Sequence, residues 1–291
     1  MLNDQAANLR RTLKQSEKQT TTKTISIVSG KGGVGKSNVA LNFALELLAK
    51  EKKVLLFDLD VGMGNIDILL GLQAKYTIFD MLRQRLSIQD IIERGPKELS
   101  YIAGGSGINQ LFSMSKNDAN YFLNEYEKLE HMYDFIIFDL GAGVSYESMV
   151  FIQASDECFV VTTPEPTSIT DAYAMIKHIV NVKPKMSIYI VMNRSSTTKS
   201  GQNAMEKFQH VIRHFLNIDV HPLGILPDDQ LVSTAVIRQK PIILLNKRAS
   251  ISRAIQQMTD YYLHLLGESD KKSSRSFMQK LKQLFKERAI L

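Results

Sequence analysis

The sequence predicts an α/β fold: a doubly wound, mostly parallel β-sheet with helices on both faces. Short apolar runs rich in β-branched residues recur along the chain without polar alternation, which is typical of strands buried on both faces. Segments of helical periodicity separate these runs, and this alternation favours parallel pairing. The helical periods are clearest in Asn38–Lys50, Thr167–Val180 and Asn203–Leu216. The expected strands are Thr24–Ser29, Val54–Asp58, Leu99–Ala103, Phe135–Leu140, Cys158–Thr163, Ile188–Asn193 and Val220–Leu226.

The composition is that of an ordinary globular protein. Of the 291 residues, 44% are hydrophobic and 23% are charged, which excludes a disordered chain, a collagen-like fibre and a polytopic membrane protein. The single cysteine, Cys158, can form no internal disulfide and cannot supply the ligands of an iron–sulfur cluster. Because the sequence has neither a secretory signal nor a long apolar span, it predicts a cytoplasmic protein.

The positive charge is concentrated at the two ends of the chain. The net charge is +6, but residues 1–24 carry +3 and residues 269–291 carry +5, which leaves −2 for residues 25–268. A nearly neutral body argues against a domain that wraps nucleic acid, so no nucleic-acid partner is expected. We expect three parts: an N-terminal tail and linker (1–23), one α/β domain (24–268), and a linker with an amphipathic helix (269–291).

A glycine-rich loop follows the first expected strand. Its pattern is Gly, four residues, then Gly-Lys-Ser, and a helical segment begins directly after it. In such a loop the glycines let successive backbone N–H groups face an anion, the lysine reaches the terminal phosphates and the serine hydroxyl ligates Mg²⁺. The sequence therefore predicts a binding loop for a nucleotide with Mg²⁺. The residues concerned are Gly30, Lys31, Gly32, Gly33, Val34, Gly35, Lys36, Ser37 and Asn38.

Three aspartates follow strands that should end beside this loop. Asp58 and Asp60 lie two residues apart at the end of the second expected strand, so their side chains should share a face. A pair of aspartates that merely caps a turn is the alternative. Asp139 ends the buried run that begins at Phe135, the arrangement that holds Mg²⁺ directly or through water.

The loop resembles the deviant Walker A motif of the MinD/ParA family of P-loop ATPases, because a second lysine, Lys31, stands at its beginning. The resemblance implies a homodimer in which Lys31 crosses to the nucleotide of the partner; a solvated loop charge is the alternative. It also implies that Asp60 positions the attacking water and that Asp58 helps to order Mg²⁺. The expected catalytic residues are therefore Lys31, Lys36 and Asp60, and the expected metal ligands are Ser37, Asp58 and Asp139.

Two later strand ends match the places where this family reads adenine. The resemblance implies that the Asn193 amide pairs with the base edge and that the segment at Pro227 supplies backbone contacts; turns without such a role are the alternative. ATP is expected instead of GTP, because the string after Asn193 contains no aspartate to read guanine. The residues expected at the base are Asn193, Arg194, Pro227, Asp228 and Asp229.

The C-terminal segment has the pattern of an amphipathic helix. Basic residues flank or oppose a narrow apolar stripe, as in helices that lie reversibly on an anionic membrane surface. A helix packed on the protein's own domain or on a partner is the alternative. Docking in one nucleotide state and release in another would reconcile the two. The expected membrane residues are Phe277, Met278, Lys280, Leu281, Lys282, Leu284, Phe285 and Lys286.

The N-terminal string Asp4-Gln5-Ala6-x-x-Leu9-Arg10 resembles the activator motif of the flagellar-number regulators within the MinD/ParA family. The resemblance implies that these five residues bind and stimulate FlhF, a GTPase of the signal-recognition-particle type, with Gln5 entering the active site of that partner. It also implies cytoplasmic flagellar-ring proteins as further partners. A disordered leader without function is the alternative.

Two other kinds of protein in the family fit part of the pattern. A MinD-type regulator of the division site would share the ATPase and the membrane helix but lack the N-terminal activator string. A ParA-type partition ATPase would bind DNA, which the nearly neutral body opposes. The combined resemblance therefore predicts an ATPase switch that dimerises with ATP on the inner face of the cell membrane and controls flagellar number and placement.

Overall fold

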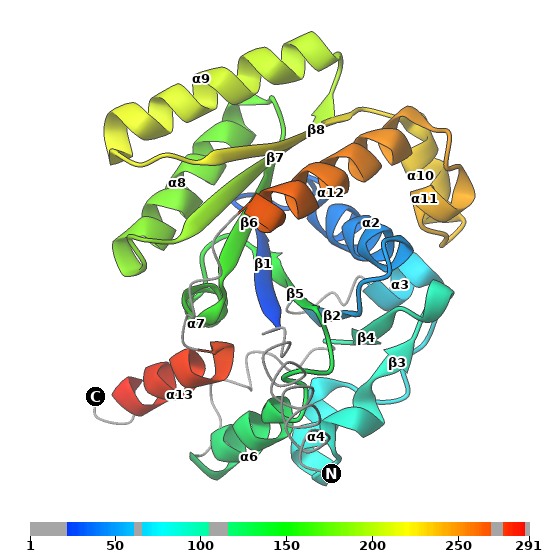
Figure 1. The fold of residues 1–291 in the computed structure, drawn as a ribbon, viewed down its shortest axis with the longest axis vertical. Coiled ribbons are helices and arrows are strands. Elements are labelled where there is room, and N and C mark those ends of the chain that lie inside the picture. The colour runs from blue at the N-terminus through cyan, green and yellow to red at the C-terminus, as the bar shows by residue number, and fades with distance from the viewer. Residues whose placement is uncertain (1–21, 61–65, 105–115, 269–275, 289–291) are drawn as a thin grey trace, which may run out of the picture.

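The computed structural model describes residues 22–60, 66–104, 116–268 and 276–288. Within these residues the strands form one sheet in the order β3-β4-β2-β5-β1-β6-β7-β8 (Figure 1). All neighbouring strands are parallel except β3 and β4, which are antiparallel. The predicted doubly wound, mostly parallel sheet is therefore confirmed. The strands are β1 Lys23–Ser29, β2 Val54–Leu59, β3 Glu93–Arg94, β4 Ser100–Ile102, β5 Phe135–Ala142, β6 Glu157–Thr162, β7 Ser187–Ser195 and β8 His221–Pro227.

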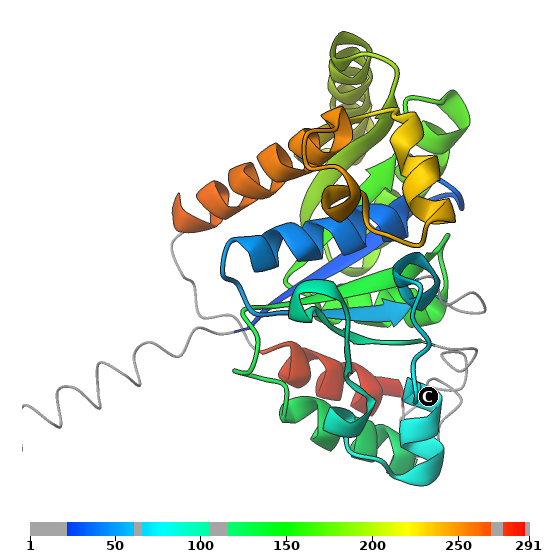
Figure 2. The same ribbon diagram turned by 90° about the vertical axis from the view of Figure 1, so that its right-hand side faces the viewer.

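Helices cover both faces of this sheet (Figures 1 and 2). One hydrophobic cluster joins the sheet to α2, α3, α10, α11 and α12, and a second cluster joins the opposite face to α4, α6, α7, α8, α9 and α13. The helices are α2 Lys36–Ala49, α3 Ile66–Leu70, α4 Ile78–Gln84, η1 Ile88–Ile91, η2 Pro96–Glu98, α6 Lys116–Glu127, α7 Tyr146–Ala154, α8 Pro166–Val182, α9 Thr198–Leu216, α10 Gln230–Ile237, α11 Ile242–Leu245, α12 Ser250–Glu268 and α13 Phe277–Arg288.

The central strands are buried on both faces, as their uniformly apolar sequences predict. Every residue of β2 and β6 is buried. In β1 the alternation of side chains sends Ile25 and Ile27 into the cluster with α2, whereas Val28 joins the cluster on the other face. The carboxyl ends of β1, β2 and β5 meet at one edge of the sheet, because these strands are parallel and in register. The candidate site lies at this edge.

The apolar stripe of α13 is buried against the domain. Phe277 stacks on Phe138 of β5 with ring centroids 4.9 Å apart, and Met278 and Leu281 join the same cluster. Leu284 and Phe285 are half-buried against it. These five residues were expected to face lipid, but in this conformation they pack on the protein's own core, which is the alternative that the sequence left open. α13 thus shares one hydrophobic cluster with the α/β domain in this conformation.

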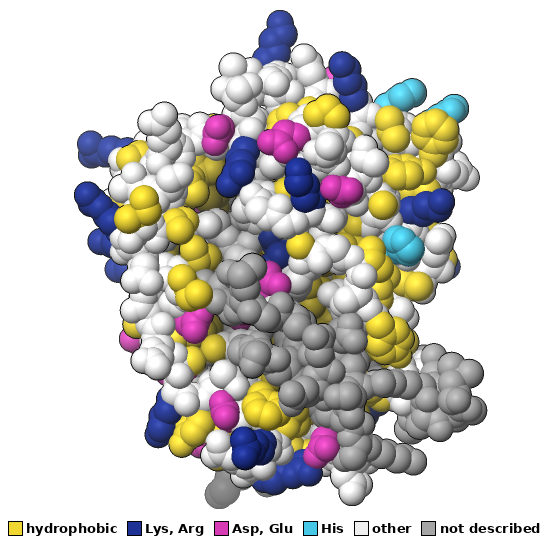
Figure 3. All heavy atoms as spheres, turned by 180° about the vertical axis from the view of Figure 1, so that it is seen from behind, with side chains coloured by type: hydrophobic (Ala, Val, Ile, Leu, Met, Phe, Trp, Pro, Cys, Tyr) yellow, Lys and Arg dark blue, Asp and Glu magenta, His cyan; other side chains and the backbone are white. Residues whose placement is uncertain are grey.

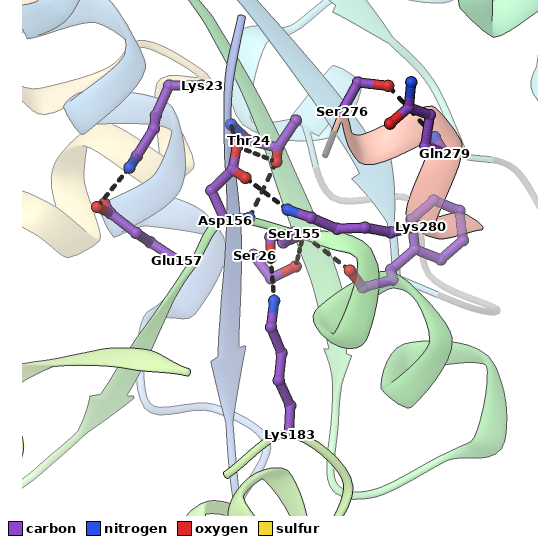
Figure 4. Close-up of polar contacts among 11 residues, drawn as sticks. Lys23, Thr24, Ser26, Ser155, Asp156, Glu157, Lys183, Ser276, Gln279 and Lys280 are labelled. Carbon is purple, nitrogen blue, oxygen red and sulfur yellow. Dashed lines mark hydrogen bonds and ion pairs between the residues drawn. The ribbon is translucent and has the colours of Figure 1, made fainter. Parts of the chain in front are cut away.

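Polar contacts fix α13 at the amino-terminal edge of the sheet (Figure 4). Lys280 Nζ lies 2.7 Å from Asp156 Oδ1, while Asp156 Oδ2 accepts hydrogen bonds from the backbone N–H and the hydroxyl of Thr24. Burial raises the pKa of Asp156, but Lys280 and Thr24 more than offset this effect, so its pKa lies below the usual value. Lys282 pairs with Glu127 at 3.1 Å. Two of the expected membrane lysines are thus engaged in cis.

Two parts of the sequence-based prediction concern residues or side chains that the structure does not describe. These are the N-terminal string with Asp4, Gln5, Ala6, Leu9 and Arg10, and the side chain of Lys286. Among the helices that the structure describes, none combines the length and the apolar character needed to cross a bilayer.

Candidate nucleotide-binding site

The glycine-rich loop connects β1 to α2 at the carboxyl edge of the sheet, as predicted. Gly35 has a φ of +90°, and a Cβ placed there would lie 2.5 Å from Nδ2 of Asn193. A Cβ on Gly30 would lie 2.2 Å from the backbone of Asp171 in α8. Only glycine therefore fits these two positions, because a side chain would push the loop away from β7 and α8.

Lys36 occupies the centre of the site. Its side chain is 6% exposed, and its Nζ lies 2.5 Å from Asp139 Oδ1 and 3.4 Å from Asp60 Oδ2. It also donates to the Ser37 hydroxyl at 3.3 Å. Burial by itself lowers the pKa of Lys36, but the charges of Asp139, Asp60 and Asp58 raise it above its usual value. The ammonium group therefore stays charged between the carboxylates.

Asp58 and Asp139 lie side by side on β2 and β5. Their Cα atoms are partners in the strand register, and both side chains are buried. Asp58 Oδ1 accepts a hydrogen bond from the backbone of Asp60, and its Oδ2 accepts one from Ile66, so Asp58 caps the turn after β2. Asp139 differs, because its Oδ2 is buried and accepts no hydrogen bond from the described residues. This oxygen is available to a ligand that enters the site.

Lys31 lies at the entrance of the loop and contacts the start of α8. Its Nζ donates to the Thr167 hydroxyl at 3.3 Å and lies 3.8 Å from Glu165 Oε2. The side chain is 44% exposed. Lys31 is thus an exposed charge with a weak contact to the start of α8 in the same chain. Sequence reasoning missed Glu165 and Thr167, and their separation of more than 130 residues from Lys31 gave no local signal.

The residues expected at the base lie on one side of the loop. Asn193 is buried on β7 and donates from Nδ2 to the Val34 carbonyl at 2.8 Å, which fixes the loop. The Asp228 backbone donates to the Ser195 carbonyl at 3.0 Å. Asp229 caps α10 through the Leu231 N–H and accepts from Ser250 at 2.8 Å. In this conformation Asp229 has the turn role that was the alternative.

The remaining expected residues lie on the elements that the sequence predicts for them. Arg194 is exposed with a φ of 52°, and Pro227 ends β8. Gly32, Gly33, Val34 and Ser37 belong to the loop or the first turn of α2. The Asn38 carbonyl accepts from Asn42 within α2. Sequence reasoning also missed Gly104, where a Cβ would lie 2.3 Å from the Asp58 carbonyl; a lone glycine gives no signal of that approach.

Comparison with known proteins places the chain in a family. Residues 22–192 match the family described as AAA domain. The antiactivator FleN of Pseudomonas aeruginosa is 31% identical over 81% of this chain and 85% of its own length. The flagellum site-determining protein YlxH of Helicobacter pylori is 34% identical over 89% of this chain and 90% of its own length.

Solved structures show the same fold. A chain of the MinC:MinD cell division protein complex of Aquifex aeolicus superposes with a TM-score of 0.70 at 25% identity, covering 88% of this chain and 100% of that chain. MinD of Pyrococcus horikoshii, complexed with Mg-ADP, gives a TM-score of 0.67 at 23% identity, over 86% and 100%. The fold and the site thus define a P-loop ATPase of the MinD/ParA type. Within that family, the chain belongs to the group that contains FleN and YlxH, also called FlhG.

Proposed function

We propose that this ATPase is an ATP- and Mg²⁺-dependent switch that controls the number and placement of flagella. The carrying observation is Lys36, held charged between Asp139 and Asp60 beside a loop that tolerates only glycine at Gly30 and Gly35. The flagellar output follows from the relatives. YlxH of Helicobacter pylori is 34% identical, whereas MinD of the same organism is 28% identical over 90% of this chain.

The donor set fits Mg²⁺ with a nucleotide. The buried Oδ2 of Asp139, which has no hydrogen-bond partner among the described residues, and the Ser37 hydroxyl are hard oxygen donors of the kind Mg²⁺ prefers. Asp58 lies beside Asp139 and would help to orient water. When bound, the ion would neutralise charge that develops on the phosphates. The loop N–H groups from Gly30 to Asn38 would hold those phosphates.

Lys36 must change partners for this to occur. Its ammonium group contacts Asp139 here, and it would leave that carboxylate to reach the terminal phosphates. Asp60 is half-buried directly after β2, and its proposed role is to orient the attacking water. Asn193, Arg194 and the segment Pro227–Asp229 border the side of the loop where the adenine base would lie.

Dimerisation is the next step of the proposed switch. Lys31 would leave Glu165 and Thr167 and cross to the nucleotide of a second copy, as the family resemblance implies. Its half-exposed side chain and its long contact to Glu165, 3.8 Å, make the cis contact weak. The closed dimer would present two copies of α13, and two weak anchors on one body bind more tightly than either alone.

Membrane binding requires that α13 leave the domain, because its apolar stripe is buried in the docked state. Co-sedimentation with vesicles that contain phosphatidylglycerol tests this. The full chain should pellet with a non-hydrolysable ATP analogue and stay in the supernatant with ADP. Vesicles of phosphatidylcholine alone are the control for charge. Equal pelleting with both nucleotides would contradict the switch, and no pelleting with either would remove membrane binding from the proposal.

The N-terminal string is proposed to stimulate the GTPase FlhF. It lies outside the described residues, so this proposal rests on the resemblance of Asp4, Gln5, Ala6, Leu9 and Arg10 alone. The full chain should raise the rate of GTP hydrolysis by FlhF, and a Gln5→Ala variant should lose that stimulation because Gln5 is expected in the active site of the partner. Gln15→Ala, in the linker, is the matched control. Full stimulation by Gln5→Ala would contradict the assigned role.

A further inference from the structure

A surface away from α13 combines exposed apolar and basic side chains. α10 ends in Val236 and Ile237, which are 38% and 82% exposed. Arg238 and Lys240 follow directly, and both are exposed. Figure 3 shows basic side chains with hydrophobic ones among them at its left edge, the side on which α10 lies. Single exposed apolar residues are common, but an isoleucine this exposed beside a valine and two cations is not an ordinary solvated helix end.

The end of α3 continues this surface. Gly71, just after α3, approaches Gln239 so closely that a Cβ on the glycine would lie 3.0 Å from the Cβ of Gln239. Leu72 and Ile68 are 41% and 57% exposed. Both helices lie on the same side of the molecule in two views (Figures 1 and 2). We name the α3–α10 surface from these residues: Ile68, Leu72, Val236, Ile237, Arg238 and Lys240.

On the α10 side of this surface the charge has one sign, whereas α3 contributes one carboxylate, Asp67. From residue 230 to residue 259 the chain contains five Lys or Arg and no Asp or Glu. Neither Arg238 nor Lys240 forms an ion pair with any residue that the structure describes. By contrast, Lys280 and Lys282 of α13 are both paired with carboxylates. The two cations of the α3–α10 surface are therefore available to an anionic partner without breaking an internal contact.

We propose that the α3–α10 surface binds the anionic headgroup region of a lipid bilayer directly, as a second membrane contact beside α13. Cations at a protein edge attract anionic lipid, and protruding isoleucine and leucine side chains gain free energy when they enter the boundary of the acyl chains. The surface offers both features at once. A nucleic-acid backbone would use the cations alone and would leave the protruding isoleucine and leucine side chains in water.

A second copy of this chain fits the same surface less well. A symmetric contact centred on α10 would bring Arg238 and Lys240 against their own copies, and no acidic residue between 230 and 259 would compensate them. Like charges brought together in this way oppose association. An anionic bilayer is thus the partner that matches both the cations and the exposed apolar side chains of the α3–α10 surface.

This inference rests on the proposed membrane association and adds an orientation to it. α10 begins directly after the Pro227–Asp229 segment, and α3 begins after the loop that follows Asp60, so the two helices that carry the surface both follow segments of the candidate nucleotide site in the chain. α13 alone would leave the domain free to rotate on its linker. A second contact on the rigid body holds the ATPase in one orientation and strengthens binding through effective concentration.

Site-specific labelling tests this contact. Cys158 is buried, and burial raises the pKa of its thiol to about 12, so an engineered cysteine on the surface can be labelled selectively. The Ile237→Cys variant of the full chain carries an environment-sensitive fluorophore. Phe215→Cys on α9 is 67% exposed on another part of the molecule and is the matched control. Emission and co-sedimentation are measured together, with an ATP analogue and vesicles of phosphatidylglycerol and phosphatidylcholine.

The expected result is a shift of emission to shorter wavelength at position 237, and none at position 215, when the chain pellets with anionic vesicles. Pelleting without a shift at 237 would overturn this inference and leave the membrane switch intact. Failure to pellet would overturn both. A shift with the ATP analogue alone would assign the surface to a second copy, and a shift with duplex DNA but not with vesicles would assign it to nucleic acid; either overturns the inference.

A pair of neutralising substitutions gives an independent measure. Arg238→Gln with Lys240→Gln removes two cations and should weaken binding to anionic vesicles by roughly 25-fold, since each basic residue near such a membrane contributes about a factor of five. Lys199→Gln with Lys207→Gln removes the same charge from exposed positions on α9 and should leave binding nearly unchanged. Equal weakening by both pairs would show that only net charge matters and would overturn the assignment to α3 and α10.

Discussion

Replacing Asp60 by alanine is expected to slow ATP hydrolysis by roughly 10²–10⁴-fold, the range for a positioned group that orients or accepts a reacting proton. Asp60 is the one carboxylate of the site with appreciable exposure among those around Lys36; its side chain is 22% exposed and that of Asp139 is fully buried. Its removal does not leave the buried ammonium group of Lys36 without a carboxylate, because Lys36 keeps its closer contact to Asp139. The fold and ATP binding should therefore survive.

Phosphate release and retained nucleotide measure this prediction. The Asp60→Ala variant should keep ATP bound and accumulate as a dimer, whereas the parent chain hydrolyses its ATP. Asp260→Ala is the matched control, because Asp260 is an exposed carboxylate on α12 that pairs only with Lys50 among the contacts seen here. Hydrolysis at the parent rate would remove Asp60 from catalysis. An Asp60→Ala chain that stays monomeric in excess ATP would contradict the coupling of ATP to dimerisation.

Much of the fold is readable from the sequence because buried parallel strands have a strong local signal. The expected strand Val54–Asp58 differs from β2 by one residue, and Leu99–Ala103 contains all of β4. The edge strand β3 escaped detection, since its two residues, Glu93 and Arg94, contain no apolar run. α9 was expected to begin at Asn203, but it begins at Thr198, where Thr197 caps its N-terminus. The sequence pattern missed this first turn because its residues are polar.

The candidate site was predictable only where the motif is local in sequence. The spacing from Gly30 to Ser37 identified the loop, and the strand ends identified Asp58 and Asp139. The contact of Lys31 with Glu165 and Thr167 joins segments far apart along the chain, and no spacing rule reveals it. The sequence offered a turn role for Asp58 as an alternative but could not decide for it, because a carboxylate after a strand can bind backbone N–H groups or order a metal ion with equal ease.

The position of α13 could not be predicted for a different reason. An apolar stripe has the same sequence pattern whether it meets lipid or a protein core, because both environments remove it from water. What decides between them is the complementary surface, here Phe138 on β5, Tyr126 on α6 and Phe151 on α7. α7 follows the loop after Asp139 in the chain, so docking of α13 and the state of the nucleotide site share one structural element.

Replacing Phe277 by alanine is expected to release α13 from the domain. The side chain is 4% exposed and contacts three aromatic rings, and a Phe→Ala change in a core costs about 3–5 kcal/mol. At the lower value the undocked population rises roughly 150-fold, since about 1.4 kcal/mol is a factor of ten. The loss in the free energy of unfolding of the domain is smaller than this. Once the substitution has cancelled the free energy of docking, α13 separates from the domain, and no further stability is lost.

Hydrogen exchange of the α13 amides measures this release. They should lose protection in Phe277→Ala, while amides of β1 and β5 keep theirs. Phe285→Ala removes the same number of atoms from a half-buried position on the helix and should have a smaller effect. Unchanged protection in Phe277→Ala would mean that the polar contacts of Lys280 and Lys282 hold the helix without the apolar stripe.

Asp156→Asn separates docking from lipid affinity, because it weakens the anchor without altering α13. The ionised form of Asp156 is favoured in the docked state by Lys280, so the substitution removes that contribution and leaves every apolar residue of the helix in place. If docking restrains membrane binding, Asp156→Asn should pellet with anionic vesicles in the presence of ADP, where the parent chain does not. If ADP-bound Asp156→Asn stays in the supernatant although its α13 amides exchange freely, release of the helix is insufficient, and closure of the dimer must supply the remaining affinity.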